Sequence, residues 1–239
     1  MKKISIQDIQ IIKTINKKGS FSDVHEVLFN NKKYAFKQFK DERIYAKGLI
    51  PKYEELNNLG LTKSVIPKIY VEDGELNGFL MKLCNHKCFS YLYGCPLDLQ
   101  IKTLREAKQA LLEIHSKNII HGDIHVSNFL FRECVLTDYD NSEFKNFKLN
   151  LEFCSPEALN FLTTYKLSKD LDIYLFNYMT FSILNESHYY KVESDICDKN
   201  YGVFKTKEAK KICKSLLLQD KIFNADFLID TVSIGETVK

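Results

Sequence analysis

Hydrophobic and polar positions alternate along the first part of the chain with the two-residue period of β-strands. Runs of this kind, separated by turn residues, predict strands at residues 9–15, 24–29, 34–39, 69–71 and 79–83. Asn30-Asn31 and Asp73-Gly74 stand between neighbouring runs, and such pairs favour tight hairpin turns. The first third of the chain is therefore predicted to form a sheet of hairpins.

Further along the chain the periodicity becomes helical. Apolar residues recur at intervals of three and four between residues 97 and 118, which predicts an amphipathic helix. Residues 171–184 are apolar on nearly every side, as expected of a helix that is buried all round. Pro51 suits the first turn of a shorter helix. Strands first and helices later predict an α+β fold of two lobes, joined near residues 84–90.

Composition places the chain among ordinary folded proteins. Its 239 residues are 45% hydrophobic and 27% charged, and no apolar run is long enough to span a bilayer. Polar residues interrupt the start of the chain, so no secretory signal is expected. The seven cysteines are odd in number and have no repeated spacing, which favours reduced thiols and a cytoplasmic location. The spacing of Cys84, Cys88 and Cys95 matches no common structural zinc site.

The net charge of +3 is mild, and nearly all of the positive charge is lysine. The densest basic segment is 205–214, where Ala209 and Ile212 recur at helical spacing. We interpret this segment as the solvated face of a helix, and we expect no nucleic-acid partner.

Side chains that could take part in catalysis or metal binding are concentrated in the segment from His121 to Asp140. Asp123 is followed five residues later by Asn128, and Asp138 comes ten residues after that. The apolar residues between Asn128 and Asp138 predict a tight hairpin, which would bring these two side chains together at its open end. Asparagine and aspartate oxygens suit Mg²⁺, and a separate carboxylate could orient a hydroxyl.

This segment resembles the catalytic loop and the metal-binding turn of the eukaryotic-like protein kinase superfamily, and the resemblance extends over about residues 9–185. It implies one bilobal, kinase-like domain that spans residues 1–239 and uses ATP and Mg²⁺. Residues 1–83 would form an antiparallel sheet lobe with one main helix. Residues 84–90 would be the hinge, and residues 91–239 a mostly helical lobe.

The resemblance also assigns roles to the catalytic residues. Asp123 would accept or orient the proton of the attacking hydroxyl, while Asn128 and Asp138 would hold Mg²⁺. Lys37 would bind the phosphates. Gly122 stands where the family has an arginine that senses a phosphorylated activation segment, so activity independent of such phosphorylation is expected.

On the nucleotide side, the segment 17–24 resembles the family's glycine-rich loop, with one of its three glycines kept. The implied nucleotide-binding set is Gly19, Ser20, Phe21, Val24, Ala35, Lys37, Glu55, Met81 and Leu83. Glu55 is chosen over Glu54 as the partner of Lys37, although the apolar register of this helix would place Lys52 at that position.

Two further motifs resemble those of protein kinases. Ser155-Pro156-Glu157 is similar to the motif that closes the activation segment. Asp172 is similar to the aspartate at the start of a buried helix that hydrogen-bonds the backbone of the catalytic loop. A buried carboxylate requires such donors.

The motifs disagree on which molecule carries the hydroxyl that accepts the phosphoryl group. The kinase motifs favour a serine/threonine protein kinase, with a protein substrate. His125 and Asn150, however, replace a lysine and a threonine that are usual in those enzymes. The pattern His-Gly-Asp-x-His-x-x-Asn is more similar to aminoglycoside, choline and lipopolysaccharide-core sugar kinases, so a sugar or small-molecule hydroxyl is the alternative. Because the glycine-rich loop is altered, a pseudokinase that binds nucleotide without transferring phosphate is a further alternative. The sequence does not indicate an oligomeric state.

Overall fold

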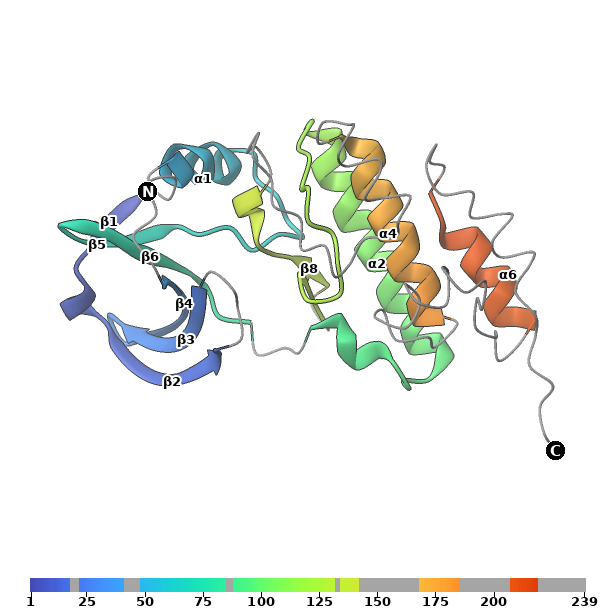
Figure 1. Cartoon of the computed structure of the whole chain (residues 1–239), viewed down its shortest axis with the longest axis horizontal. Coiled ribbons are helices and arrows are strands. Elements are labelled where there is room, and N and C mark those ends of the chain that lie inside the picture. Colours follow the sequence, from blue (N-terminus) through green and yellow to red (C-terminus); the bar gives the residue numbers. More distant parts are fainter. Residues whose placement is uncertain are drawn as a thin grey trace. The chain divides into compact units, whose positions relative to one another are not determined.

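The fold is described from a computed structural model for residues 1–17, 22–40, 48–84, 88–131, 134–141, 168–184 and 207–218. The chain is α+β and divides into two compact units, Met1–Asn85 and His86–Lys239. The first unit holds the sheet and one helix, and the second holds three helices and a small hairpin among its described residues (Figure 1). The boundary between the units falls within residues 84–90.

A six-stranded sheet forms the first unit, in the order β1-β5-β6-β4-β3-β2. The strands are β1 (Lys2–Ile4), β2 (Gln10–Asn16), β3 (Ser22–Phe29), β4 (Lys32–Phe39), β5 (Ile69–Asp73) and β6 (Glu75–Lys82). The predicted strands are confirmed, and so is the hairpin between β3 and β4. Asn30 and Asn31 have φ angles of 48° and 60°, values that asparagine tolerates better than most residues.

The predicted strands pair antiparallel, but the sheet as a whole is mixed, because the unpredicted strand β1 pairs with β5 in parallel. The three residues of β1 are too few to show an alternating pattern, and their partners lie more than sixty residues away along the chain. Ile4 contributes a buried side chain to the core of the sheet. This tertiary contact, rather than any local signal, makes β1 a strand and the sheet mixed.

The two faces of the sheet have different neighbours. One face forms the hydrophobic core of the unit, which consists of Ile4, Val27, Phe29, Phe36, Val71 and Leu80. The opposite face meets helix α1 (Leu49–Asn58) through Tyr53, whose ring contacts that of Phe79 edge-on at 5.0 Å between centroids. Pro51 lies in the first turn of α1, as predicted, where its missing N–H is not needed.

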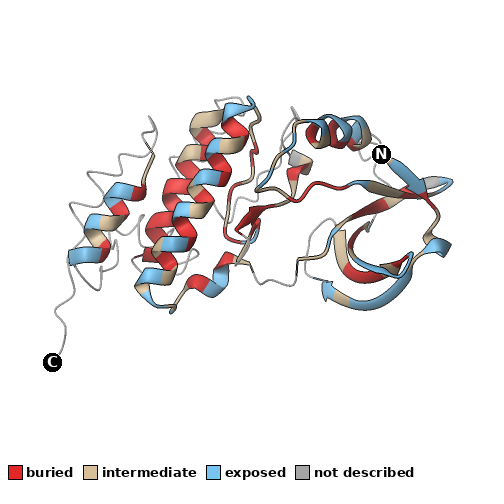
Figure 2. Cartoon of the chain, turned by 180° about the vertical axis from the view of Figure 1, so that it is seen from behind, coloured by how far each residue is buried: buried red, intermediate tan, exposed pale blue. Residues whose placement is uncertain are grey.

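Three helices and a hairpin make up the described part of the second unit. The helices are α2 (Leu97–Ser116), α4 (Lys169–Leu184) and α6 (Lys207–Leu216), and each packs against the other two. Strands β7 (Phe129–Leu130) and β8 (Val135–Leu136) form the predicted hairpin beside α2. Helix α4 is buried on almost every side, as its sequence predicted (Figure 2).

The basic segment that the sequence assigned to a helix face lies on α6. Ala209, Cys213 and Leu216 are buried, whereas Lys207, Lys211 and Lys214 are exposed. The interpretation as an amphipathic helix is confirmed. Among the helices that the structure describes, none is both long and apolar enough to cross a membrane.

Gly78 allows a close backbone approach between neighbouring strands of the sheet. Its φ is 157°, and a Cβ atom placed on it would lie 2.0 Å from the carbonyl oxygen of Lys37 on the neighbouring strand. We expect Gly78→Ala to lower the free energy of unfolding by about 2 kcal/mol or more, because the backbone must shift to relieve the overlap. Urea unfolding of the purified chain measures this loss.

Gly48→Ala is the matched control, since nothing lies within 4 Å of the added Cβ and its φ is negative. This variant should change stability by less than about 0.5 kcal/mol. Equal losses in the two variants would contradict the role given to Gly78.

Candidate functional site

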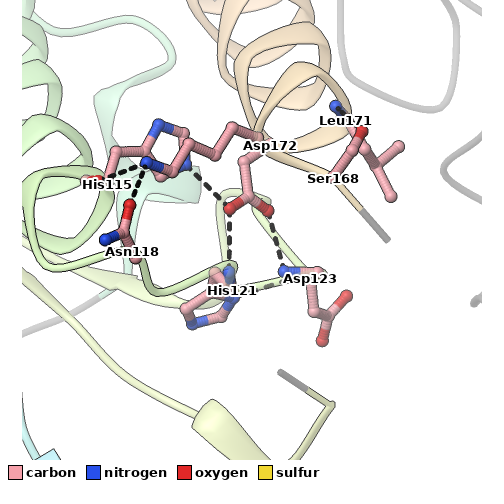
Figure 3. A network of polar contacts seen from close by, with 9 residues as sticks. His115, Asn118, His121, Asp123, Ser168, Leu171 and Asp172 are labelled. Atoms are coloured by element: carbon pink, nitrogen blue, oxygen red, sulfur yellow. Dashed lines mark hydrogen bonds and ion pairs between the residues drawn. The ribbon is translucent and has the colours of Figure 1, made fainter. Parts of the chain in front are cut away.

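A fully buried carboxylate, that of Asp172 in the first turn of α4, organises the candidate site. Oδ2 accepts hydrogen bonds from the backbone N–H of His121, at 2.8 Å, and from Nε2 of His115, at 2.9 Å. Oδ1 accepts from the backbone N–H of Gly122, at 2.7 Å (Figure 3). The predicted hydrogen bonds of Asp172 to the backbone of the loop at His121 and Gly122 are confirmed.

Helix α2 is fastened to the start of α4 by a second set of contacts. Lys169 Nζ donates to the carbonyl oxygen of His115 at 2.6 Å and to Oδ1 of Asn118 at 3.0 Å. A cation at this position satisfies the exposed carbonyl groups at the C-terminal end of α2 and interacts favourably with the helix dipole. The loop that follows α2 is thus held in place before it reaches His121.

Gly122 has a φ of 77°, in the left-handed region that glycine adopts without strain. This conformation allows two consecutive N–H groups, those of His121 and Gly122, to point at one carboxylate. A glycine at position 122 therefore matches a local requirement of the backbone.

His121 connects this loop to the end of the hairpin. Its Nε2–H donates to the carbonyl oxygen of Thr137 at 2.9 Å, and its Nδ1 accepts from the backbone N–H of Asp123 at 3.3 Å. The ring also meets that of Tyr139 at 4.7 Å between centroids. The side chain is completely buried, and this burial lowers the pKa of His121, so the ring is neutral.

Asn128 fixes the position of Asp123. Its Nδ2 donates to the backbone oxygen of Asp123 at 2.9 Å and to Oδ2 of its carboxylate at 3.0 Å. The backbone oxygen of Asn128 accepts from the N–H of Thr137, which closes the hairpin at its open end. Oδ1 of Asn128 is the other arm of the carboxamide and takes no part in these contacts.

Asp138 follows β8 and is partly exposed, with a φ of 65°. The hairpin pairs Phe129 with Leu136, so Asn128 and Asp138 flank its open end, and the meeting of their side chains stays a prediction. One carboxamide oxygen and one carboxylate could serve as protein ligands to Mg²⁺, which usually keeps several waters or phosphate oxygens as its other ligands. Within the described ranges, no group of three or more His, Cys, Asp or Glu side chains could hold a metal.

Asp123 has the electrostatics of an ionised base. Burial raises the pKa of Asp123, but contacts with His125 and with the amide of Asn128 outweigh it, and the pKa lies below the ordinary value of 3.8. The side chain remains 19% exposed. A carboxylate that is ionised, held by neighbours and still accessible can accept a hydrogen bond from a hydroxyl.

In the first unit, the strand register places four predicted nucleotide-binding residues on one face of the sheet. Val24 pairs with Lys37 and Ala35 pairs with Met81, while Ala35 and Lys37 are two residues apart on β4. This face is opposite the hydrophobic core of the unit. Lys37 is only 8% exposed, which is unusual for lysine and sets it apart from the exposed Lys32 and Lys33 of the same strand.

Other predicted residues are less closely grouped. Glu55 lies on the exposed side of α1, whereas Lys52 is buried, as the apolar register indicated. Leu83 follows β6 and is partly exposed. The described contacts do not test the proposed pairing of Glu55 with Lys37. Gly19, Ser20 and Phe21, together with Asn150 and the Ser155-Pro156-Glu157 motif, lie outside the described residues.

Two residues that hold the loop in position, His115 and Lys169, were not predicted from the sequence. A signal was present for His115, because it is a polar residue on the apolar side of an amphipathic helix, next to buried Ile114. Lys169 carried no local signal, since its partners belong to the end of another helix.

Comparison with known proteins gives no family for the chain. No model of a protein family matches the sequence, and a search of curated proteins found no match either.

The first prediction from the site concerns Asp172. In Asp172→Asn an amide N–H₂ group replaces an oxygen that faces buried donors, so at least one of them loses its acceptor. We expect the free energy of unfolding to fall by about 2–3 kcal/mol, measured by urea unfolding. Asp170→Asn, two residues away and partly exposed, should change it by less than about 0.5 kcal/mol. Similar values for both variants would refute the central role of Asp172.

The second prediction concerns acid sensitivity. Burial lowers the pKa of His121 below the ordinary 6.5, against smaller opposing effects of Asp172, Asp123 and Asp138. The contribution of the buried His121 ring to the free energy of unfolding is therefore fully present above about pH 6.5. It decreases at lower pH, because the unfolded chain then binds a proton that the folded chain does not.

The free energy of unfolding should thus fall between about pH 7.5 and pH 5.5, and the fall should be smaller in His121→Asn. Urea titrations of both proteins at the two pH values provide the comparison. An identical pH dependence in the variant would show that His121 is not the group responsible.

Proposed function

We propose that the chain is an ATP- and Mg²⁺-dependent phosphotransferase with a protein-kinase-like bilobal fold, most consistent with a serine/threonine protein kinase of the cytoplasm. The proposal rests chiefly on one observation, the contact of Asn128 with Asp123 at the open end of the hairpin that leads to Asp138. This arrangement supports a base and two metal ligands in adjacent positions.

Phosphoryl transfer depends on positioning and on charge neutralisation, and the residues match those needs. Oδ1 of Asn128 and the carboxylate of Asp138 would hold Mg²⁺ on the phosphates of ATP. Asp123 would orient the acceptor hydroxyl and take its proton as the γ-phosphoryl group leaves ADP. Lys37 would neutralise phosphate charge, and the apolar Val24, Ala35 and Met81 would contact the adenine ring of ATP.

A sugar or other small-molecule kinase is the second candidate. The observation in its favour is His125, which contacts the carboxylate of Asp123 at the position where protein kinases usually carry a lysine. The two candidates share the chemistry of transfer and differ in the acceptor. Transfer from labelled ATP to casein, to the chain itself or to a sugar panel distinguishes them.

The prediction for this site is that one substitution affects phosphoryl transfer but not the binding of Mg²⁺·ATP. Asp123→Ala should lower the rate of phosphoryl transfer by about 10²–10⁴-fold, because the acceptor loses its base. The affinity for Mg²⁺·ATP should remain within about twofold of the original, since Asp123 binds neither nucleotide nor metal in this scheme. Transfer assays with labelled ATP and calorimetry measure the two quantities.

Asp98→Ala, which removes an acidic side chain near the start of α2, is the control and should leave both quantities unchanged. An unaltered transfer rate in Asp123→Ala would remove Asp123 from its role. Absence of any ATP affinity in the unmodified chain, with or without Mg²⁺, would overturn the proposed function.

A further inference from the structure

His125 lies two residues after Asp123 and contacts it from the same loop. Its Nε2 is 3.5 Å from Oδ2 of the Asp123 carboxylate. Its Nδ1 accepts a hydrogen bond from the backbone N–H of Ser127 at 3.2 Å. The ring is mostly buried, at 13% exposure, and its backbone oxygen accepts from the N–H of Asn128. Both the side chain and the backbone of His125 are therefore held within the loop.

The contact with Ser127 determines which ring nitrogen of His125 is the acceptor. A backbone N–H can only donate, so Nδ1 must be the unprotonated nitrogen and Nε2 carries the hydrogen. The Nε2–H group faces Oδ2 of Asp123. The Nδ2 of Asn128 donates to the same oxygen. The hydrogen bond from Asn128, at 3.0 Å, and the longer contact from His125 Nε2, at 3.5 Å, thus meet at one oxygen of the carboxylate.

Asn128 donates one hydrogen bond to that carboxylate. The amide nitrogen of Asn128 also donates to the backbone oxygen of Asp123, so two acceptors together set the orientation of this amide group. A second donor from another direction would restrict rotation of the carboxylate about the Cβ–Cγ bond. Small errors in such an orientation have large effects on rate.

We propose that His125 is a positioning residue that orients the Asp123 carboxylate for the acceptor hydroxyl. This inference rests on the proposed function. His125 acts through Asp123, keeps its own proton throughout the transfer and does not bind ATP or the metal. The proton of the acceptor goes to Asp123, as in the proposed reaction.

The test compares two uncharged substitutions of His125, each of which can keep only one of the two contacts of the imidazole ring. In His125→Asn the side-chain oxygen can replace Nδ1 as the acceptor for Ser127 N–H, but the amide ends short of Asp123. In His125→Gln the amide N–H₂ can reach the former position of Nε2 and donate to Asp123. The two side chains are uncharged, so a change of charge does not enter the comparison.

We expect His125→Asn to lower kcat by about tenfold to a hundredfold, with KM for Mg²⁺·ATP unchanged, and His125→Gln to recover most of the loss. Transfer from labelled ATP to the acceptor that the unmodified chain labels, or ADP release in water where none is labelled, measures kcat. Urea unfolding confirms that both variants are folded.

Equal kcat values in the two variants, whether high or low, would overturn the inference, as would a higher kcat in His125→Asn. In these cases the unmodified chain still transfers phosphate and the proposed function stands. Absence of both transfer and ADP release in the unmodified chain would instead remove the proposed function, and this inference with it.

Discussion

The buried charge of Asp172 is the constraint on which the second unit depends. A carboxylate removed from water is strongly destabilising unless donors surround it, and an isolated one would cost several kcal/mol. Here the donors are two consecutive backbone N–H groups and an imidazole of α2. Hydrogen bonds to a charged group contribute about 1.5–3 kcal/mol each. Helix α4, the end of α2 and the loop at His121 therefore stabilise one another as one cooperative element.

The position of each later residue follows from this anchor. The two N–H groups reach one carboxylate because Gly122 adopts a left-handed conformation, and Asp123 comes next along the chain. His121, buried by the same loop, donates to Thr137, and Thr137 in turn donates to the backbone of Asn128. Asn128 then binds the carboxylate of Asp123. This connected set of hydrogen bonds holds Asp123 and Asn128, the proposed base and one proposed metal ligand, without long or flexible side chains.

The elements that the sequence predicted were those with a local signal. The Asn30-Asn31 hairpin, the amphipathic α2 and the fully apolar α4 each have a pattern within a few residues. Strand β1 and the contact of Lys169 with α2 depend on partners far away in sequence, and no local pattern encodes them. The choice of Glu55 followed a spacing taken from a resemblance, whereas the apolar register of α1 correctly placed Lys52 inside.

The backbone at Asp138 supports a functional interpretation of its side chain. Among the described residues, five that are not glycine have positive φ, and the other four lie at hairpin turns or just after a helix. A left-handed conformation costs roughly 1–2 kcal/mol for most residues, although aspartate and asparagine tolerate it better. Asparagine would adopt the same backbone without adding a negative charge. The conformation alone thus does not explain a carboxylate here, whereas a divalent cation shared with Asn128 would neutralise that charge.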